Sequence, residues 1–249
     1  MSKDLHFSAA TGIHQGDRAS QQDRVHVFKS NREPRCLLVI VADGMGGASG
    51  GRKASDQVMQ TAEQLFKSFN SKTDDAKKLL EQIALDAHMV IGLTAVTSEQ
   101  QPHSTFAAFL TTSSSECYWA HVGDSRIYHF NHATLINRTL DHSYVQALVD
   151  CGELTEEKAQ RHPKANILTR ILGSKSVPAI DFHHVEKIKS GDCFIACTDG
   201  LWAYYSVQEM GQILASLPPR EATEFLIQSA RTRSNKRGDN LSVAIVKYD

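Results

Sequence analysis

The most constraining feature of the sequence is a short pattern that occurs three times, an apolar run that stops at an aspartate followed by a small residue. The three copies are VIVADG with Asp43, WAHVGDS with Asp124 and FIACTDG with Asp199. A fourth aspartate, Asp239, lies just before the apolar run 241–248. Such runs predict buried strands. A single Asp-Gly is usually only a turn, but several carboxylates at strand ends indicate a site for a hard cation such as Mg²⁺ or Mn²⁺.

The glycines after Asp43 allow a second interpretation, a loop that binds a nucleotide phosphate. The segment 46–51 has the glycine spacing of the phosphate loop, but Arg52 stands where lysine is required, and Lys53 is followed by Ala54 instead of a hydroxyl residue. The dinucleotide-binding pattern of glycines fails as well. Glycines can also permit a tight connection between a strand and a helix, or leave a backbone carbonyl free to face an ion. Nucleotide binding is therefore disfavoured.

Composition and charge narrow the class of protein. The 249 residues include 27 Lys and Arg against 28 Asp and Glu, a net charge of -1, so no basic field indicates a nucleic-acid or membrane partner. No apolar run approaches the roughly 18 residues of a membrane span, and the first residues lack the apolar core of a secretory signal. No Pro- or Gly-rich linker divides the chain. We therefore expect one cytoplasmic domain over residues 1–249, a monomer without nucleic-acid or membrane partners.

The cysteines and histidines carry weaker signals. Cys193 and Cys197 share one face of an expected strand, but a zinc site usually brings spaced Cys and His pairs, so buried free thiols are favoured over a metal pair. His142 and His162 lie in a mixed polar segment, where hydrogen-bonding or surface roles are favoured over catalysis. The basic segment 231–237 is typical of a solvated loop. Attraction of acidic phosphopeptides by this segment is the alternative.

Hydrophobic periodicity predicts the helices and strands. Helices are expected at 51–69, 74–96, 143–151, 155–160, 207–217 and 220–231. Strands are expected at 24–28, 36–42, 105–112, 117–122, 126–130, 135–137, 180–185, 193–198 and 241–248. Asp74 and Asp75 are expected in the first turn of the second helix, where they suit the positive helix N-terminus. Strands joined by hairpins beside pairs of helices predict antiparallel sheets covered by helices, not alternating βαβ units.

Seven stretches of the chain together match one known family. They are GDRASQQD (16–23), VADGMGG (41–47), VGDSRIY (122–128), TLDHS (139–143), NILTRILG (166–173), ACTDGLW (196–202) and GDNLSVAIV (238–246). In this order and over nearly the whole chain, the sequence resembles the bacterial form of the metal-dependent serine/threonine protein phosphatases of type 2C, the PPM family. The resemblance implies an α/β (α+β) fold, a four-layer sandwich of two stacked antiparallel sheets flanked by helices. It also implies hydrolysis of phosphoserine and phosphothreonine in proteins by a metal-activated water, without a phosphoenzyme.

The resemblance implies a metal-binding role for five positions. Asp43 would bridge two ions with the carbonyl of Gly44 beside it, and Asp199 and Asp239 would complete the ligands of the first ion. Asp124 would help to hold a third, more weakly bound ion. The ions would be Mn²⁺ or Mg²⁺, and a pair of such ions about 3.5–4 Å apart stabilises the attacking and leaving oxygens of a displacement.

The resemblance also implies how the substrate is handled. Arg18 would bind the substrate phosphate, because its planar fork matches two phosphate oxygens. Asp23 would orient the metal-bound water, and Asn240 would help to shape the site beside Asp239. The segment 139–175 corresponds to the family's variable flap next to the active site. The implied partners are phosphorylated protein substrates and a cognate serine/threonine kinase that the enzyme opposes.

Four departures from the family pattern accompany these matches. Gln22 stands where many members have Glu, which predicts weaker affinity for the second metal. Met45 replaces a His of the animal members and leaves the general acid unassigned, and Ala203 replaces a common Asp and predicts a weaker third metal site. The segment 103–105, HST, stands where Gly-Thr-Thr is common, with no consequence assigned. Gln22 and Ala203 keep open an alternative, a pseudophosphatase that binds phosphoproteins as a regulator, although the retained aspartates weigh against it.

Overall fold

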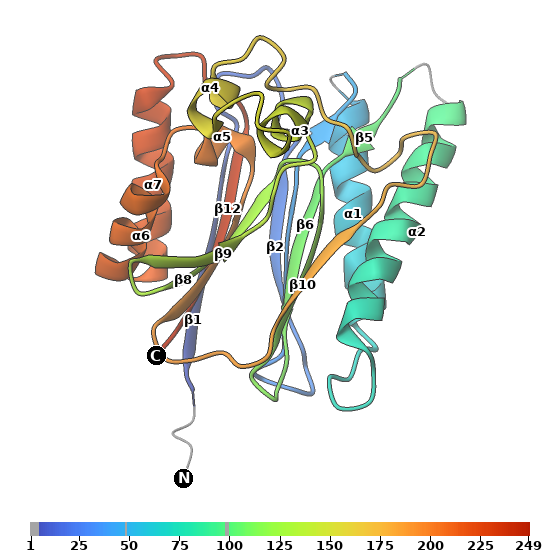
Figure 1. The fold of residues 1–249 in the computed structure, drawn as a ribbon. Coiled ribbons are helices and arrows are strands. Elements are labelled where there is room, and N and C mark those ends of the chain that lie inside the picture. The colour runs from blue at the N-terminus through green and yellow to red at the C-terminus, as the bar shows by residue number, and fades with distance from the viewer. Residues whose placement is uncertain (1–4, 48, 98–99) are drawn as a thin grey trace.

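The backbone forms four layers, and the two inner layers are β-sheets (Figure 1). The computed structural model describes residues 5–47, 49–97 and 100–249. Two five-stranded antiparallel sheets lie face to face, and helices cover the outer face of each sheet. The predicted fold class, two stacked antiparallel sheets flanked by helices, is therefore confirmed.

Each sheet combines strands from distant parts of the chain. The sheet that we call the β12 sheet has the order β1 (Phe7–His14), β12 (Leu241–Tyr248), β11 (Asp192–Cys197), β8 (Arg126–Asn131) and β9 (Thr134–Arg138). The other, the β3 sheet, has the order β10 (Asp181–Val185), β7 (Cys117–Val122), β6 (Phe106–Thr111), β3 (Leu37–Ala42) and β2 (Arg24–Lys29). A separate two-residue pairing joins β4 (Gly44–Met45) to β5 (His103–Ser104).

Two long helices pack on each sheet, and three short ones gather at one end. The β3 sheet is covered by α1 (Gly50–Phe66) and α2 (Ala76–Thr97), and the β12 sheet by α6 (Val207–Ser216) and α7 (Pro219–Arg233). The short helices are α3 (Tyr144–Asp150), α4 (Glu156–Gln160) and α5 (Asp199–Trp202). They lie at the upper end of the sheets in Figure 1.

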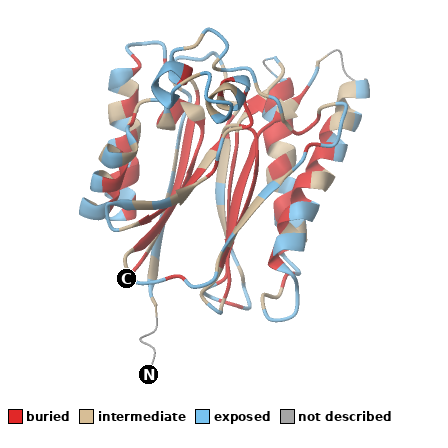
Figure 2. Ribbon diagram, viewed as in Figure 1, coloured by how far each residue is buried: buried red, intermediate tan, exposed pale blue. Residues whose placement is uncertain are grey.

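Alternation along the central strands divides the core into three parts. In β3, Leu38 and Ile40 point into the core shared with α1 and α2, whereas Leu37, Val39 and Val41 point into the core between the two sheets. Successive side chains of a strand face opposite sides of a sheet, and both sides of this strand are covered. A continuous apolar run is the pattern expected of a strand buried on both faces, and Figure 2 shows the central strands buried over most of their length.

The cysteines are free thiols, as the sequence predicts, and none forms a disulfide. Cys193 and Cys197 lie on the face of β11 that packs against α6 and α7. Burial raises the pKa of Cys193 to about 12, so its thiol stays protonated at neutral pH. Both residues act as small apolar core side chains.

The structure departs from the predictions mainly at the N-terminus. Strand β1 was not expected, because FSAATGIH contains few strongly apolar residues, and it lies at the edge of the sheet as the partner of β12. The second helix begins at Ala76, so Asp74 and Asp75 precede its first turn. Asp75 accepts a hydrogen bond from the Lys78 backbone N–H at 3.1 Å, the usual contact of an N-cap.

Helix α2 has an unusually apolar composition. By length and composition alone, the stretch Ala76–Val96 could cross a membrane, with a mean hydropathy of 1.4 and 28% of it buried. The prediction that no apolar run approaches the length of a membrane span is therefore wrong by length and composition. A helix that packs in a protein core passes the same test, and Leu80, Ile83 and Ala87 of α2 face the core shared with the β3 sheet.

Candidate active site

A cavity of about 500 Å³ opens at the end of the two sheets. Six of the seven residues predicted for the site line it, namely Arg18, Asp43, Gly44, Asp124, Asp199 and Asp239. The seventh, Asp23, is fully buried and accepts a hydrogen bond of 2.7 Å from the hydroxyl of Thr198, the residue before Asp199. The fold therefore brings together all of the predicted residues, including Arg18 and Asp239, which are 221 positions apart.

The antiparallel pairing explains why these residues meet. Strand β3 ends just before Asp43, and Arg24 at the start of β2 pairs with its last residue, Ala42, which places Asp23 at the same edge. In the facing sheet, β11 ends and its neighbour β12 begins at that edge. Carboxylates that follow or precede these strands consequently converge from both sheets on one point.

The carboxylates raise one another's pKa. Burial raises the pKa of Asp23 to about 7, and among the neighbouring carboxylates the charge of Asp199 contributes most to this rise. Burial and then the charge of Asp239 raise the pKa of Asp199 to about 6. Asp43 and Asp124 have pKa values well above the usual range, chiefly because they are buried and secondly because of Asp23 and Asp199, respectively. Ionisation of the whole group therefore requires added positive charge.

The donor atoms at the site suit divalent cations that prefer oxygen. The Oδ1 atoms of Asp23 and Asp199 are buried and have no hydrogen-bond partner among the described residues. Buried polar atoms are normally paired, so an orphaned carboxylate oxygen indicates a missing partner. Of the described residues that line the cavity, none is a histidine or cysteine. Carboxylate and carbonyl oxygens without nitrogen or sulfur favour Mg²⁺ or Mn²⁺ over zinc.

Asn240 fixes the loop that carries Arg18. Its side-chain amide donates to the carbonyls of Gln15 at 2.7 Å and Ser20 at 3.0 Å, and its oxygen accepts from the Gln22 backbone N–H at 2.7 Å. The guanidinium of Arg18 lies at the mouth of the cavity, with Nη2 2.5 Å from Oδ2 of Asp239. The expectation that Asn240 helps to shape the site corresponds to these three bonds.

Part of the basic segment 231–237 has a structural function. Both Nη atoms of Arg231 donate to Asp17, at 2.7 and 2.9 Å, and Asp17 also accepts from the Gly238 backbone N–H. The hydrogen bond from Arg231 lowers the pKa of Asp17 to about 2. Arg233 forms an ion pair with Glu209. Arg231 therefore ties the loop of Arg18 to the segment before Asp239, and Arg233 ties α7 to α6. Lys236 and Arg237 are exposed, so the predicted solvated loop is limited to these two basic residues.

Thr105 holds the turn that presents Asp43, a role that the sequence did not reveal. The Asp43 backbone N–H donates to Oγ1 of Thr105 at 2.8 Å, and the Asp43 carbonyl accepts from the Thr105 N–H at 2.9 Å. Gly44 must be glycine for a steric reason, because a Cβ there would lie 2.0 Å from the carbonyl oxygen of Gly51 in the first turn of α1. The segment 103–105, to which no consequence had been assigned, thus contains the anchor of this turn.

The three other departures also have a place in the structure. The side-chain amide of Gln22 donates to the Gly47 carbonyl at 3.0 Å and to Oγ of Ser20 at 3.2 Å, which ties two loops together. Met45 lines the cavity. Ala203 is exposed at the end of α5 and lines a second, neighbouring cavity.

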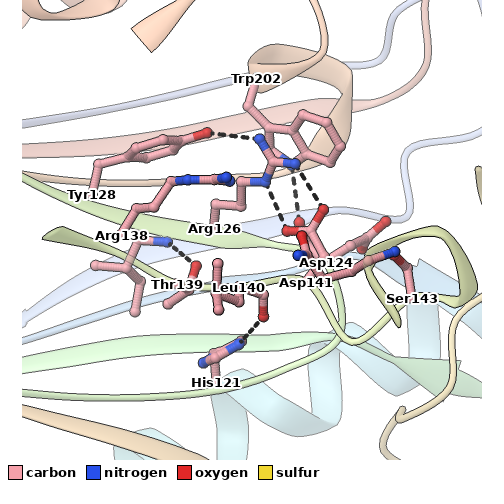
Figure 3. Close-up of polar contacts among 12 residues, drawn as sticks. His121, Asp124, Arg126, Tyr128, Arg138, Thr139, Leu140, Asp141, Ser143 and Trp202 are labelled. Atoms are coloured by element: carbon pink, nitrogen blue, oxygen red, sulfur yellow. Dashed lines mark hydrogen bonds and ion pairs between the residues drawn. The ribbon is translucent and has the colours of Figure 1, made fainter. Parts of the chain in front are cut away.

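The flap segment is joined to the site by a buried ion pair (Figure 3). Nε and Nη2 of Arg126 each donate to Asp141 at 2.7 Å, and the guanidinium stacks on the Trp202 ring at 3.5 Å. Trp202 in turn donates from Nε1 to the carbonyl of Asp124 at 2.9 Å. Asn166, within the flap, lines the cavity. The segment 139–175, the expected flap, is therefore linked to the site near its start, through Arg126 and Trp202, and again at Asn166.

His142 has a hydrogen-bonding role, as the sequence favoured. One nitrogen of His121, one of His142 and a carboxylate oxygen of Asp181 lie within 4.8 Å of one another, a spacing that a metal ion could bridge. However, Nδ1 of His142 accepts from the Gly123 backbone N–H at 3.2 Å, and Nε2 lies 3.2 Å from Asp181. Since both ring nitrogens are used, the cluster holds the base of the flap rather than offering a free metal site.

Comparisons with known proteins identify the relatives of this chain. The family model of protein phosphatase 2C matches residues 12–240. The protein phosphatase PhpP of Streptococcus pneumoniae is 30% identical over 259 residues, which cover 98% of each chain. The crystal structure of the Mycobacterium tuberculosis serine/threonine phosphatase PstP/Ppp is 26% identical, with a TM-score of 0.82 and coverage of 97% of this chain and 98% of that one. The catalytic domain of PstP in complex with two manganese ions gives a TM-score of 0.80 at 26% identity, over 98% and 99% of the two chains.

Proposed function

This chain belongs to the protein phosphatase 2C family, and from that membership we propose that it hydrolyses phosphoserine and phosphothreonine in proteins. The observation that carries the proposal is the cavity itself. Four aspartates from the ends of both sheets line it, together with Arg18. The whole of residues 1–249 forms the catalytic domain, with 139–175 as its flap. The pseudophosphatase alternative finds no support among the relatives and structures named above.

We further propose that the site holds two Mn²⁺ or Mg²⁺ ions and a weaker third. Asp43, the carbonyl of Gly44, Asp199 and Asp239 would hold the pair, and Asp124 would hold the third ion. Such ions supply Lewis-acid chemistry, lowering the pKa of water and offsetting the charge of the phosphate dianion. The raised pKa values of the aspartates support this assignment, because bound cations would restore their ionised forms.

Arg18 and Asp23 are proposed as the residues that act on the substrate and on water. The Arg18 side chain is 62% exposed at the mouth of the cavity, where its planar guanidinium can donate two parallel hydrogen bonds to phosphate oxygens. One oxygen of Asp23 is held by Thr198 and the other is free, so the carboxylate has a fixed orientation. A buried carboxylate with one unpaired oxygen is placed to accept a proton from water.

Water is the proposed nucleophile, so no covalent phosphoenzyme forms. Of the described residues that line the cavity, none is a cysteine or a histidine that could carry the phosphoryl group. A location in the cytoplasm, a monomeric state and a cognate serine/threonine kinase stay predictions from the sequence.

The test compares a variant that lacks one proposed metal ligand with a variant that carries the same substitution at an exposed position. The full chain is assayed with p-nitrophenyl phosphate and a phosphothreonine peptide, in Mn²⁺ and in EDTA, together with Asp199→Asn and Asp150→Asn. Asp150 is exposed on α3 and lies outside the cavity, so D150N should match the wild type. D199N should lose turnover and bind fewer Mn²⁺ ions by calorimetry. Full activity of D199N, or equal activity in EDTA, would refute the proposal.

A further inference from the structure

A second cavity, of about 130 Å³, lies between the flap and the wall formed by Arg126 and Trp202. It shares Asp124, Asn166 and Asp199 with the larger cavity, so the two cavities adjoin. Figure 3 shows the wall, in which the guanidinium of Arg126 lies between Asp141 and the indole of Trp202. A group bound in the second cavity would therefore lie directly beside a substrate phosphate in the first.

The charged side chains of this wall are already paired within the chain. Arg126 is bound to Asp141 by two hydrogen bonds of 2.7 Å. Arg138 is bound to Glu156 at 2.6 Å. Apart from the two proposed metal ligands, the charged residues that line the cavity are satisfied by these pairs. A charged side chain that entered would lose its hydration without gaining a counterion, which is unfavourable.

Three of the five neutral polar side chains that line the cavity are hydrogen-bonded within the chain. Trp202 donates its indole N–H to the Asp124 carbonyl, and the amide nitrogen of Gln146 donates to Asp150 at 2.8 Å. The hydroxyl of Ser143 accepts from the Gln146 backbone N–H. The other two, Gln160 and Asn166, are exposed to solvent. A guest would find the donors of Trp202 and Gln146 occupied, and burying a polar group without a partner is costly.

Five further lining side chains are aliphatic and small, namely Val145, Val149, Ala159, Ala165 and Ala203. At position 203 the resemblance to the family leads one to expect aspartate, so the alanine replaces a charge with a methyl group. The volume of about 130 Å³ is well above the roughly 10–15 Å³ that one water molecule needs, and it admits one aliphatic side chain.

We propose that this cavity binds the aliphatic side chain of a residue that flanks the phosphorylated serine or threonine. The enzyme would then favour phosphorylation sites with Val, Leu or Ile beside the phosphoresidue. This inference rests on the proposed phosphatase function and defines its substrate class. Adjacency to the phosphate-binding cavity, paired wall charges and the five small aliphatic side chains carry it together.

The test uses phosphothreonine peptides that differ at one flanking position. Leu or Lys is placed immediately before or immediately after the phosphothreonine, and kcat/KM is measured for each peptide and for p-nitrophenyl phosphate. The wild type should prefer Leu over Lys by about tenfold or more at one of the two positions, the usual discrimination of an apolar pocket. Equal kcat/KM values for Leu and Lys at both positions would overturn the inference.

Three variants locate the preference. Val149→Trp places an indole in the cavity and should abolish the preference for Leu while p-nitrophenyl phosphate turnover is kept. Ala147→Trp, on the exposed side of the same helix, is the matched control and should keep both. Val149→Asp adds a charge to the cavity and should shift the preference toward Lys, which covers the case that V149W fails to fold. An unchanged preference for Leu in V149W or V149D would contradict the proposal. If the wild type did not hydrolyse p-nitrophenyl phosphate at all, the proposed phosphatase function itself would be refuted.

Discussion

The ion pair between Arg126 and Asp141 allows a quantitative test of how the flap is held. Only 12% of the Arg126 side chain and 8% of the Asp141 side chain are exposed, and two hydrogen bonds of 2.7 Å join them. The variants are Asp141→Asn, Arg126→Met and the double change. Removing one partner of a buried pair costs about 3–5 kcal/mol, because the other charge is left uncompensated.

The structure predicts a different loss of unfolding free energy for each single variant. In D141N the guanidinium cannot lose its proton, but it keeps its stack on Trp202 at 3.5 Å and its bond to the Tyr128 hydroxyl at 3.1 Å. We therefore expect about 3 kcal/mol, the lower end of that range. In R126M the lone Asp141 can take up a proton, which from a reference pKa near 3.9 costs at most about 4 kcal/mol at pH 7.

The two variants should respond differently to pH. In R126M the Asp141 carboxylate is buried without a partner, which destabilises its charged form in the folded state. A group of this kind contributes its full stability below the unfolded pKa and loses it as pH rises through the folded pKa. The deficit of R126M should therefore shrink between pH 7 and pH 5. The deficit of D141N should not, because arginine does not titrate in this range.

Urea unfolding of the full chain at both pH values measures these differences. A loss of about 3 kcal/mol should also lower Tm by about 6–12 °C in a chain of this length. The double variant R126M/D141N leaves neither charge unpaired, so its deficit should be about 2–3 kcal/mol smaller than the sum of the single deficits. Additive deficits, or a loss below about 0.5 kcal/mol in D141N, would refute the view that this pair is a buried, coupled unit.

Three further predictions concern the site. Gly44→Ala should lower Tm and weaken Mn²⁺ binding, because the new Cβ meets the Gly51 carbonyl oxygen at 2.0 Å. Gly92→Ala lies on α2 with open space around its Cβ and should raise the unfolding free energy by about 0.5–1 kcal/mol. Equal effects of the two variants in thermal melts would contradict this prediction. In EDTA the free energy of unfolding should fall from pH 5 to pH 8. The reason is that the raised pKa values of Asp199 (about 6) and Asp23 (about 7) make stability greatest at low pH. Saturating Mn²⁺ should remove the trend, and a flat profile in EDTA would count against this prediction. Asn240→Ala frees the Arg18 loop and should reduce kcat/KM for phosphate esters by up to about a hundredfold; a wild-type value would show that the loop needs no such anchor.

The strands that could be predicted from the sequence are those whose own side-chain pattern shows which of their faces are buried. β3 reads as six apolar residues because both of its faces are covered, and its predicted and observed bounds differ by one residue. β1 has no such pattern. It is an edge strand whose place depends on backbone pairing with β12, from Phe7 opposite Tyr248 to His14 opposite Leu241. Backbone hydrogen bonds leave little trace in side-chain composition.

The candidate site divides in the same way. The aspartates were recognisable because the same pattern, a carboxylate at the end of an apolar run, recurs along the chain. Thr105 and Thr198 were not, because each acts on a partner 62 or 175 positions away, through contacts that only the assembled sheets create. The roles of Arg18 and Asp23 came from the family resemblance, since neither lies in a pattern that announces its chemistry. Their positions agree with those roles, and the assignments stay predictions.

The pairing of β1 with β12 also bears on when the protein becomes an enzyme during its synthesis. The loop after β1 carries Arg18, and the Asp17 N–H in that loop donates to the Gly238 carbonyl, while Asp239 lies two residues before β12. Until residues 238–248 have left the ribosome, β1 and β11 lack their shared neighbour and Arg18 lacks its support. We therefore expect a nascent chain to lack the assembled site until β12 inserts between β1 and β11.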